Sequence, residues 1–446
     1  MTQWGRAIVL AVKIPILPRG ENVYQKTTLN NGLRLITDYM PHTRSASICI
    51  FIGTGSRYET KAMSGASHFV EHMLFRGTEK RLTSCAISAE IEGVGGSLNA
   101  ATDRETTVYW CKVPQPHFER GLDVLCDMLL ASRFDPDDVE KERTVIIEEI
   151  NMSYDAPSSR VGLLIEELMW GTHPLGWDIA GTKKSVSALT RADLMSYMAQ
   201  HYRPEGTVIS VAGNVRHKEV VAAVKRRLGC WKSAGGIKRF KPYTEKTGSR
   251  LKVEKRDIEQ SHLCLSLPGL SAFDPQRYTL DIMNVILGEG MSCRLFTRVR
   301  DDLGLAYSIS SYVEHLSDTG ALTVYAGVDT SKLTLALKAI AGELGRLGDE
   351  LVSETELAKV KELTKGRLLL RLEDSRSVAG WHGAQEITRG ETPTVDEVVA
   401  KIEAVTADNL RQLAAELIRP ERFRLAVVGP VRESAALRAI LGSDSD

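Results

Sequence analysis

Apolar residues follow a strand-like pattern at two corresponding places in the chain, residues 47–52 and residues 262–267. After each run come stretches in which apolar residues recur at helical spacing, and then further strand-like runs. Each half ends with a valine-rich strand followed by one more helix. Segments ordered in this way predict an α/β fold (α+β class) in which helices flank a mostly antiparallel sheet. The pattern therefore predicts two such units in succession.

Short sequences recur with one constant displacement, as in Arg203-Pro204-Glu205 and Arg419-Pro420-Glu421, where 419 minus 203 is 216. Four pairs of segments share this displacement: 107–109 with 323–325, 188–190 with 404–406, 203–205 with 419–421, and 211–215 with 427–431. One register shared by separated segments indicates an internal duplication of domain size. We therefore expect two similarly folded domains, residues 21–234 and residues 249–446.

Two further segments lie outside the predicted domains. Residues 232–250 are rich in glycine and charge and lack periodicity, which predicts a linker at residues 235–248. Residues 1–20 carry an apolar run interrupted by Lys13 and Pro15, without the unbroken core of a secretory signal. We expect them to be an N-terminal extension of a cytoplasmic protein. No stretch reaches the about 20 apolar residues that span a bilayer, so no membrane partner is expected.

Composition excludes several classes of protein. The chain has 446 residues, of which 43% are hydrophobic and 26% charged, as in ordinary globular domains rather than disordered or fibrous proteins. Lys and Arg number 57, as do Asp and Glu, so no net charge attracts nucleic acid. Seven cysteines without CxxC spacing indicate reduced thiols in a cytosol-like compartment.

The segment His68-Phe69-Val70-Glu71-His72 carries the chemistry that distinguishes this chain. On a helix, residues four apart lie one turn above each other, so His68 and His72 point the same way with Glu71 beside them. Two neutral imidazoles can bind zinc, and a catalytic site takes one further protein ligand while leaving a position for water. The motif thus predicts part of a zinc site with an adjacent base. The alternative is a surface helix with two solvated histidines.

A second predicted helix, residues 137–154, offers the missing ligand. Its first turn opens with carboxylates, and apolar residues follow at near-helical spacing. Glu142 and Glu149 lie seven residues apart on one face, whereas Glu148 is rotated by about 100° from Glu149. At most one of Glu148 and Glu149 can face the metal. We favour Glu149 as the third ligand, with Glu142 in support.

These motifs resemble those of the inverted-motif zinc peptidases, the group that contains pitrilysin, insulin-degrading enzyme and the mitochondrial processing peptidase. The family pattern is His-x-x-Glu-His, about 76 residues, then Glu, and 76 residues lie between His72 and Glu149 here. The resemblance implies that His68, His72 and Glu149 bind one Zn²⁺, that Glu71 is the general base, and that Glu142 supports activity. It covers nearly the whole chain after residue 20 and is closest to the short two-domain members.

The second half lacks these ligands. The constant displacement maps the predicted metal site onto four other residues: Asn284, Leu287, Gly288 and Lys365. No second zinc site is therefore expected. Arg300 and Tyr307, seven residues apart, instead resemble the family's C-terminal arginine and tyrosine, which implies that they bind substrate and the oxyanion of the transition state. The alternative is an arginine and a tyrosine on an ordinary surface turn.

Small residues near residue 100 resemble the strand on which the family accepts its substrate. Residues 95–102 are followed by a strand-like run, residues 106–110. An exposed edge would let an extended peptide hydrogen-bond as an added strand beside Asn99 and Ala100, a mode that tolerates many side chains. The alternative is a tight turn ahead of an interior strand.

The expected activity is that of a zinc metalloendopeptidase acting on extended oligopeptides or presequence-like segments. Zinc lowers the pKa of a bound water toward about 7, and Glu71 can take that proton and return it to the leaving amine. The alternatives are a non-catalytic structural or binding subunit of the same fold and a zinc enzyme of other chemistry, such as a small-amide hydrolase. A homodimer is the favoured assembly, and a heterodimer with an inactive paralogue is the alternative.

Overall fold

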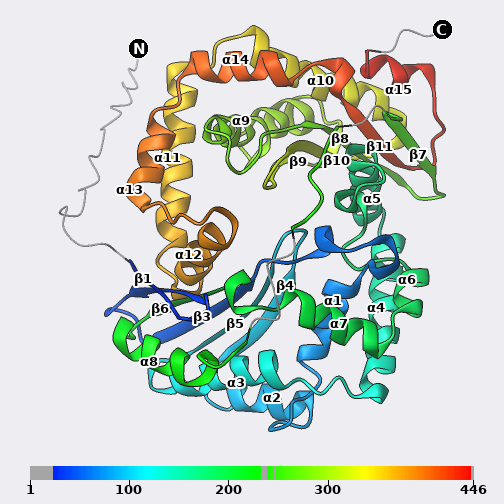
Figure 1. The fold of residues 1–446 in the computed structure, drawn as a ribbon. Helices are drawn as coiled ribbons and strands as arrows, with labels where there is room; N and C mark the ends of the chain where they lie inside the picture. Colours follow the sequence, from blue (N-terminus) through cyan, green and yellow to red (C-terminus); the bar gives the residue numbers. More distant parts are fainter. Residues whose placement is uncertain (1–23, 233–238, 246–247, 443–446) are drawn as a thin grey trace.

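The computed structural model describes residues 24–232, 239–245 and 248–442, which form two sheets with helices around them (Figure 1). The predicted extension at residues 1–20 lies outside these residues, as do 235–238 and 246–247 of the predicted linker. The described linker residues, 239–245 and 248, belong to no helix or strand. Across the described ranges, no helix combines the length and apolar character that crossing a membrane requires.

The first sheet has six strands in the order β1-β2-β6-β3-β5-β4. Their bounds are β1 (Tyr24–Thr28), β2 (Arg34–Tyr39), β3 (Ser45–Ile52), β4 (Ser97–Thr102), β5 (Thr107–Pro114) and β6 (Thr207–Gly213). All pairs are antiparallel except β2 with β6. Every residue of β6 is buried, as expected for a β-branched, apolar strand in the middle of a sheet that is covered on both faces. β4 lies at an edge.

The second sheet has five strands in the order β7-β11-β8-β10-β9. Their bounds are β7 (Leu251–Lys255), β8 (Gln260–Pro268), β9 (Ala306–His315), β10 (Gly320–Asp329) and β11 (Arg424–Gly429). Only β7 and β11 pair in parallel. The constant displacement found in the sequence brings β2, β6, β3 and β5 onto β7, β11, β8 and β10, in the same order. The predicted class, mostly antiparallel sheets flanked by helices, is confirmed.

Helices follow the same duplication. In the first half they are α1 (Ala66–Leu74), α2 (Ser84–Glu92), α3 (Phe118–Ala131), α4 (Pro136–Asp155), α5 (Pro157–Trp170), α6 (Lys183–Ala188), α7 (Arg191–His201) and α8 (His217–Leu228). In the second half they are α9 (Arg277–Gly288), α10 (Leu333–Asp349), α11 (Glu354–Arg371), α12 (Ser375–Arg389), α13 (Val395–Glu403), α14 (Ala407–Leu417) and α15 (Ala435–Ile440). Thr190 and Thr406, which the displacement relates, begin α7 and α14 with the same capping box.

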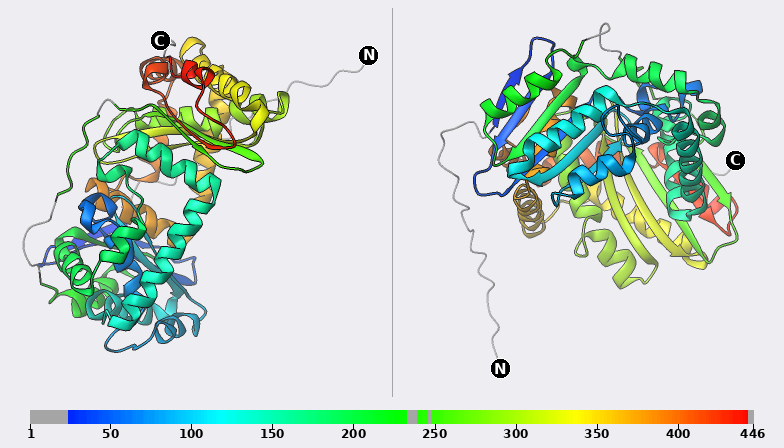
Figure 2. Two further views of the ribbon diagram at one scale, coloured as in Figure 1. Left: turned by 90° about the vertical axis from the view of Figure 1, so that its right-hand side faces the viewer. Right: turned by 90° about the horizontal axis from the view of Figure 1, so that it is seen from below.

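Two corresponding helices are exchanged between the halves. α5 packs on β8 and β11 of the second sheet, whereas α12 packs on β3 and β6 of the first. Val378 and Ala379 of α12 join a buried cluster with Phe51 and Val208. A Cβ added at Gly383 would lie 2.2 Å from Cε2 of Phe51, so only glycine allows this close approach. In the left view of Figure 2, the teal α5 lies against the sheet of the upper unit. Each half therefore covers one face of the other half's sheet.

The halves also meet at the turns that follow β4 and β9. Arg57, whose side chain is fully buried, binds Glu105 at 2.5 Å and Asp318 at 2.7 Å. Arg104 binds Glu314 at 3.1 Å across the same boundary. Buried arginines are tolerated because each is paired with carboxylates. These contacts fix the edge strand β4 relative to the second half.

Candidate metal centre

Helix α1 carries three of the predicted site residues. Phe69, Val70 and Met73 are fully buried against the first half's core, so the opposite helix face presents His68, Glu71 and His72, whose burial is intermediate. The helix starts after Gly65, which has a φ of 93°, and the buried carboxylate of Glu59 accepts the backbone N–H groups of Gly65 and Ser67. A buried acceptor for the free N–H groups of the first helical turn fixes where the helix begins.

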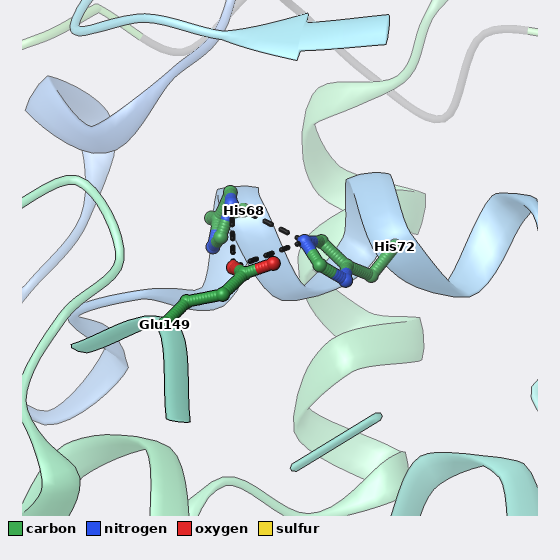
Figure 3. A group of neighbouring side chains, drawn as sticks. All are labelled: His68, His72 and Glu149. Carbon is green, nitrogen blue, oxygen red and sulfur yellow. Dashed lines mark hydrogen bonds and ion pairs between the residues drawn. The ribbon is translucent and has the colours of Figure 1, made fainter. Parts of the chain in front are cut away.

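Helix α4 packs against α1 and contributes the third residue. Nε2 of His68 and Nε2 of His72 are 3.3 Å apart. Oε2 of Glu149 lies 3.8 Å from the first nitrogen and 3.6 Å from the second. Figure 3 shows the three side chains converging from the two helices. Four tetrahedral ligands about 2 Å from a zinc ion are separated by roughly 3.3 Å, so the three donor atoms fit around one such ion.

The other ring nitrogen of His72 has a partner that sets its orientation. Nδ1 of His72 lies 2.8 Å from Oε2 of Glu142, which is only 3% exposed. A carboxylate on Nδ1 keeps the proton there and leaves the Nε2 lone pair for a metal. The guanidinium of Arg76 forms an ion pair with the other oxygen of Glu142. The sequence predicted Glu142 as a supporting residue. It did not predict the contact of Arg76 with Glu142. Arg76 lies one helical turn after His72, and that spacing could have indicated that the two side chains lie on the same side of the chain.

His68 is held in its neutral form. Burial and the neighbouring His72 lower the pKa of His68 to about 4. Its Nδ1 is shielded from solvent and has no hydrogen-bond partner among the described residues. Metal binding requires a deprotonated imidazole nitrogen, so the His68 side chain already has the required charge near neutral pH.

Glu71 lies beside the ligands and is tied to the edge strand. Oγ1 of Thr102, the last residue of β4, donates a hydrogen bond of 2.5 Å to Oε2 of Glu71. Burial raises the pKa of Glu71, although the Thr102 hydroxyl opposes the shift. A carboxyl with a raised pKa is a stronger base once ionised. The contact of Thr102 with Glu71 was not predicted, because nothing local shows that the end of this strand reaches the helix.

The predicted substrate strand is an edge strand. β4 pairs with β5 and with no other strand of the described sheet, and it packs on α1. Asn99 is exposed and Ala100 is partly buried. Oδ1 of Asn99 accepts the Ala100 N–H at 2.8 Å. Residues 97–102 thus present an open edge next to the helix that carries Glu71.

Arg300 and Tyr307 lie together on the second half. Arg300 belongs to a π-helical segment, Phe296–Asp302, and Tyr307 to β9. The Arg300 guanidinium carbon is 6.0 Å from the centre of the Tyr307 ring, which is 76% exposed. Within the described residues, neither side chain forms a hydrogen bond or ion pair with His68, His72 or Glu149. The structure therefore shows the pair, and its role in catalysis stays a prediction.

The corresponding place in the second half is occupied differently. Lys365, at the position of Glu149, binds Glu362 and Glu403. Asn284, at the position of His68, donates to Glu289 and accepts from Ser311. Among the described residues, His68, His72 and Glu149 are the one group of three side chains placed to hold a metal ion.

Known proteins resemble this chain over almost its whole length. Residues 34–183 match the family model for insulinase, peptidase family M16, and residues 188–364 match that for the peptidase M16 inactive domain. An uncharacterized zinc protease of Streptomyces coelicolor is 36% identical over 428 residues, covering 94% of this chain and 92% of the relative. An uncharacterized zinc protease of Bacillus subtilis is 37% identical over 409 residues, covering 91% of this chain and 98% of the relative.

A solved structure described as a protease from Helicobacter pylori has the same fold, with a TM-score of 0.86 at 22% identity and coverage of 91% of this chain and 99% of that one. The two family models match consecutive parts that make up more than half of the chain. The family resemblance drawn from the sequence motifs is confirmed. The chain belongs to peptidase family M16, the insulinase family.

Proposed function

We propose that this protein is a zinc metalloendopeptidase that cleaves extended oligopeptides or presequence-like segments, with Glu71 as its general base. The observation that carries the proposal is the convergence of three metal-type donor atoms within 3.8 Å of one another. The relatives from Streptomyces coelicolor and Bacillus subtilis, which are named zinc proteases, support it.

Each site residue has a role that follows from its contacts. His68, His72 and Glu149 would hold one Zn²⁺, and Glu142 orients His72. When bound, zinc acts as a Lewis acid and lowers the pKa of water to about 7. Glu71 accepts the proton of the attacking water and passes it to the leaving amine. The Thr102 hydroxyl holds the Glu71 carboxylate in one orientation throughout.

The open edge of β4 supports an extended peptide as the substrate. A peptide backbone added beside Asn99 and Ala100 would run along the strand that ends at Thr102, and so toward Glu71. Backbone pairing gives affinity without selecting side chains.

Arg300 and Tyr307 would bind substrate and transition state from the second half. We further propose that the protein is cytoplasmic, where a reducing environment would keep its seven cysteines as free thiols. As its assembly we propose a homodimer.

A quenched fluorescent peptide tests the proposed activity. The purified chain should cleave it, lose activity with a chelator, and regain activity when Zn²⁺ is returned. Mass spectrometry of the products should show cuts inside the peptide rather than removal of terminal residues. Cleavage that survives complete metal removal would contradict the proposal. A chain that binds such peptides but never cleaves them would instead favour a non-catalytic subunit.

A further inference from the structure

A cavity of about 520 Å³ lies on the second half among α9, α11, α12 and α13; the last three of these helices are on the left of the molecule in Figure 1. None of its lining residues belongs to the candidate metal centre. Its walls combine α9 with three consecutive helices that come much later in the chain, so the folded chain is needed to form it.

Arginines dominate the charge of the cavity. Four line it: Arg277, Arg367, Arg371 and Arg389. The lining carboxylates are already engaged, because Asp281 lies 3.1 Å from His315 and Glu289 lies 2.7 Å from Arg367. Among the described residues, Arg277, Arg371 and Arg389 form no ion pair. The lining of the cavity therefore holds two more arginines than carboxylates, four against two.

Two N–H groups in the cavity wall lack acceptors. Nε1 of Trp381 and Nε of Arg389 are shielded from solvent and have no hydrogen-bond partner among the described residues. Within the same ranges, the Arg389 side chain otherwise bonds only Gln385, at 3.3 Å. Buried donors in folded proteins are nearly always paired, since an unpaired one costs about 1–3 kcal/mol. A ligand that brings an acceptor to either group would satisfy it.

Part of the wall is apolar, although Thr364, Gln385 and Thr388 also line the cavity. The apolar part is formed by the ring of Trp381 and by aliphatic side chains of the surrounding helices: Ile282, Val285, Leu368, Val398 and Ile402. A small inorganic anion would leave this surface uncovered, whereas an anion with an apolar body would cover it. We propose that the cavity binds a carboxylate carried on an apolar or aromatic group, with Arg371, Arg389 and Trp381 as the donors. Such a group is either the C-terminal end of a peptide or a free small acid.

Calorimetry on the full chain with two matched probes tests the site. N-acetylphenylalanine should bind, and N-acetylphenylalaninamide, which differs only in lacking the carboxylate, should bind about tenfold or more weakly. Arg389→Gln and Arg371→Gln should each weaken binding of the acid by about tenfold. Arg411→Gln, which removes the same charge from an exposed surface pair on α14, should leave it unchanged.

Equal binding of acid and amide, or no binding of the acid, would overturn the proposal. So would Arg389→Gln and Arg371→Gln variants that bind as the Arg411→Gln variant does. The comparison of acid with amide uses the unaltered chain, so it stands even where a variant fails to fold. None of these measurements depends on peptidase activity.

A turnover experiment distinguishes the C-terminal end of a peptide from a free small acid as the ligand of the cavity. Of the experiments on this cavity, it is the one that rests on the proposed peptidase function. Two quenched peptides would differ only in a free or an amidated C-terminus. If the cavity holds the end of the substrate, amidation raises KM and N-acetylphenylalanine competes with the peptide. If it holds a free acid that acts as an effector, amidation changes nothing and the acid alters kcat.

Discussion

At the scale of single residues, the candidate centre depends on contacts that orient its ligands and base. His68 and His72 were predictable because helical spacing is a local property, and the distance to Glu149 matched a known pattern. The roles of Arg76 and Thr102 were not predicted, because their partners, Glu142 and Glu71, are reached only through tertiary packing. Local sequence therefore predicted the three donor residues and Glu142 beside them, but not the contacts that Arg76 and Thr102 make with Glu142 and Glu71.

Arg76 should be needed for stability as well as for metal binding. Arg76→Gln leaves the Glu142 carboxylate buried without its cation, which should lower the free energy of unfolding by about 2 kcal/mol. Zinc affinity should fall by about 10–100-fold, as for other residues that support ligands. Urea unfolding and competitive zinc titration measure the two effects. Parental values of both would show that the Arg76–Glu142 pair has no such role.

Thr102 should affect turnover without affecting zinc. Thr102→Val removes the hydroxyl that donates to Glu71, and we expect kcat/KM to fall by about tenfold or more, the usual effect of losing a hydrogen bond to a charged group. Zinc content should not change. Thr102→Ser keeps the donor and should restore most of the rate. If Val and Ser variants were equally impaired, the methyl group rather than the hydroxyl would matter.

At the scale of elements, the duplication was visible in the sequence but the helix exchange was not. The constant displacement correctly related the strands and the α7 and α14 helices, because such elements keep their local patterns after duplication. Which sheet α12 covers depends on the fit of Gly383 against Phe51. That complementarity between distant residues leaves no periodic signal.

Alanine substitutions at two glycines of α12 test the packing of this helix on the first sheet, one at the contact and one away from it. Gly383→Ala places a methyl group 2.2 Å from the Phe51 ring and should cost about 1–3 kcal/mol of unfolding free energy through overpacking. Gly380→Ala, on the same helix with open space around its added Cβ, should gain about 0.5–1 kcal/mol from helix propensity. Denaturant midpoints measure both. Similar stabilisation of the two variants would contradict the close contact.

At the scale of the whole molecule, buried ion pairs join the turn after β4 to the turn after β9. Arg57→Gln removes the cation shared by Glu105 and Asp318, so it should destabilise the chain by about 3 kcal/mol and separate the unfolding of the two halves into distinct steps. Arg298→Gln breaks an exposed pair with Asp302 and should change stability by less than about 0.5 kcal/mol. Scanning calorimetry would distinguish them. A single unshifted transition for Arg57→Gln would show that this contact does not couple the halves.

The most direct test of the central claim is zinc content, measured by elemental analysis after dialysis against zinc and then against zinc-free buffer. The unaltered chain, Glu71→Gln and Glu148→Gln should each keep about one zinc, because none of these loses a ligand. Glu149→Gln should lose most of it, although Glu148 is its exposed neighbour on the same helix. A full equivalent of zinc in Glu149→Gln, or none in the unaltered chain, would contradict the proposed metal centre.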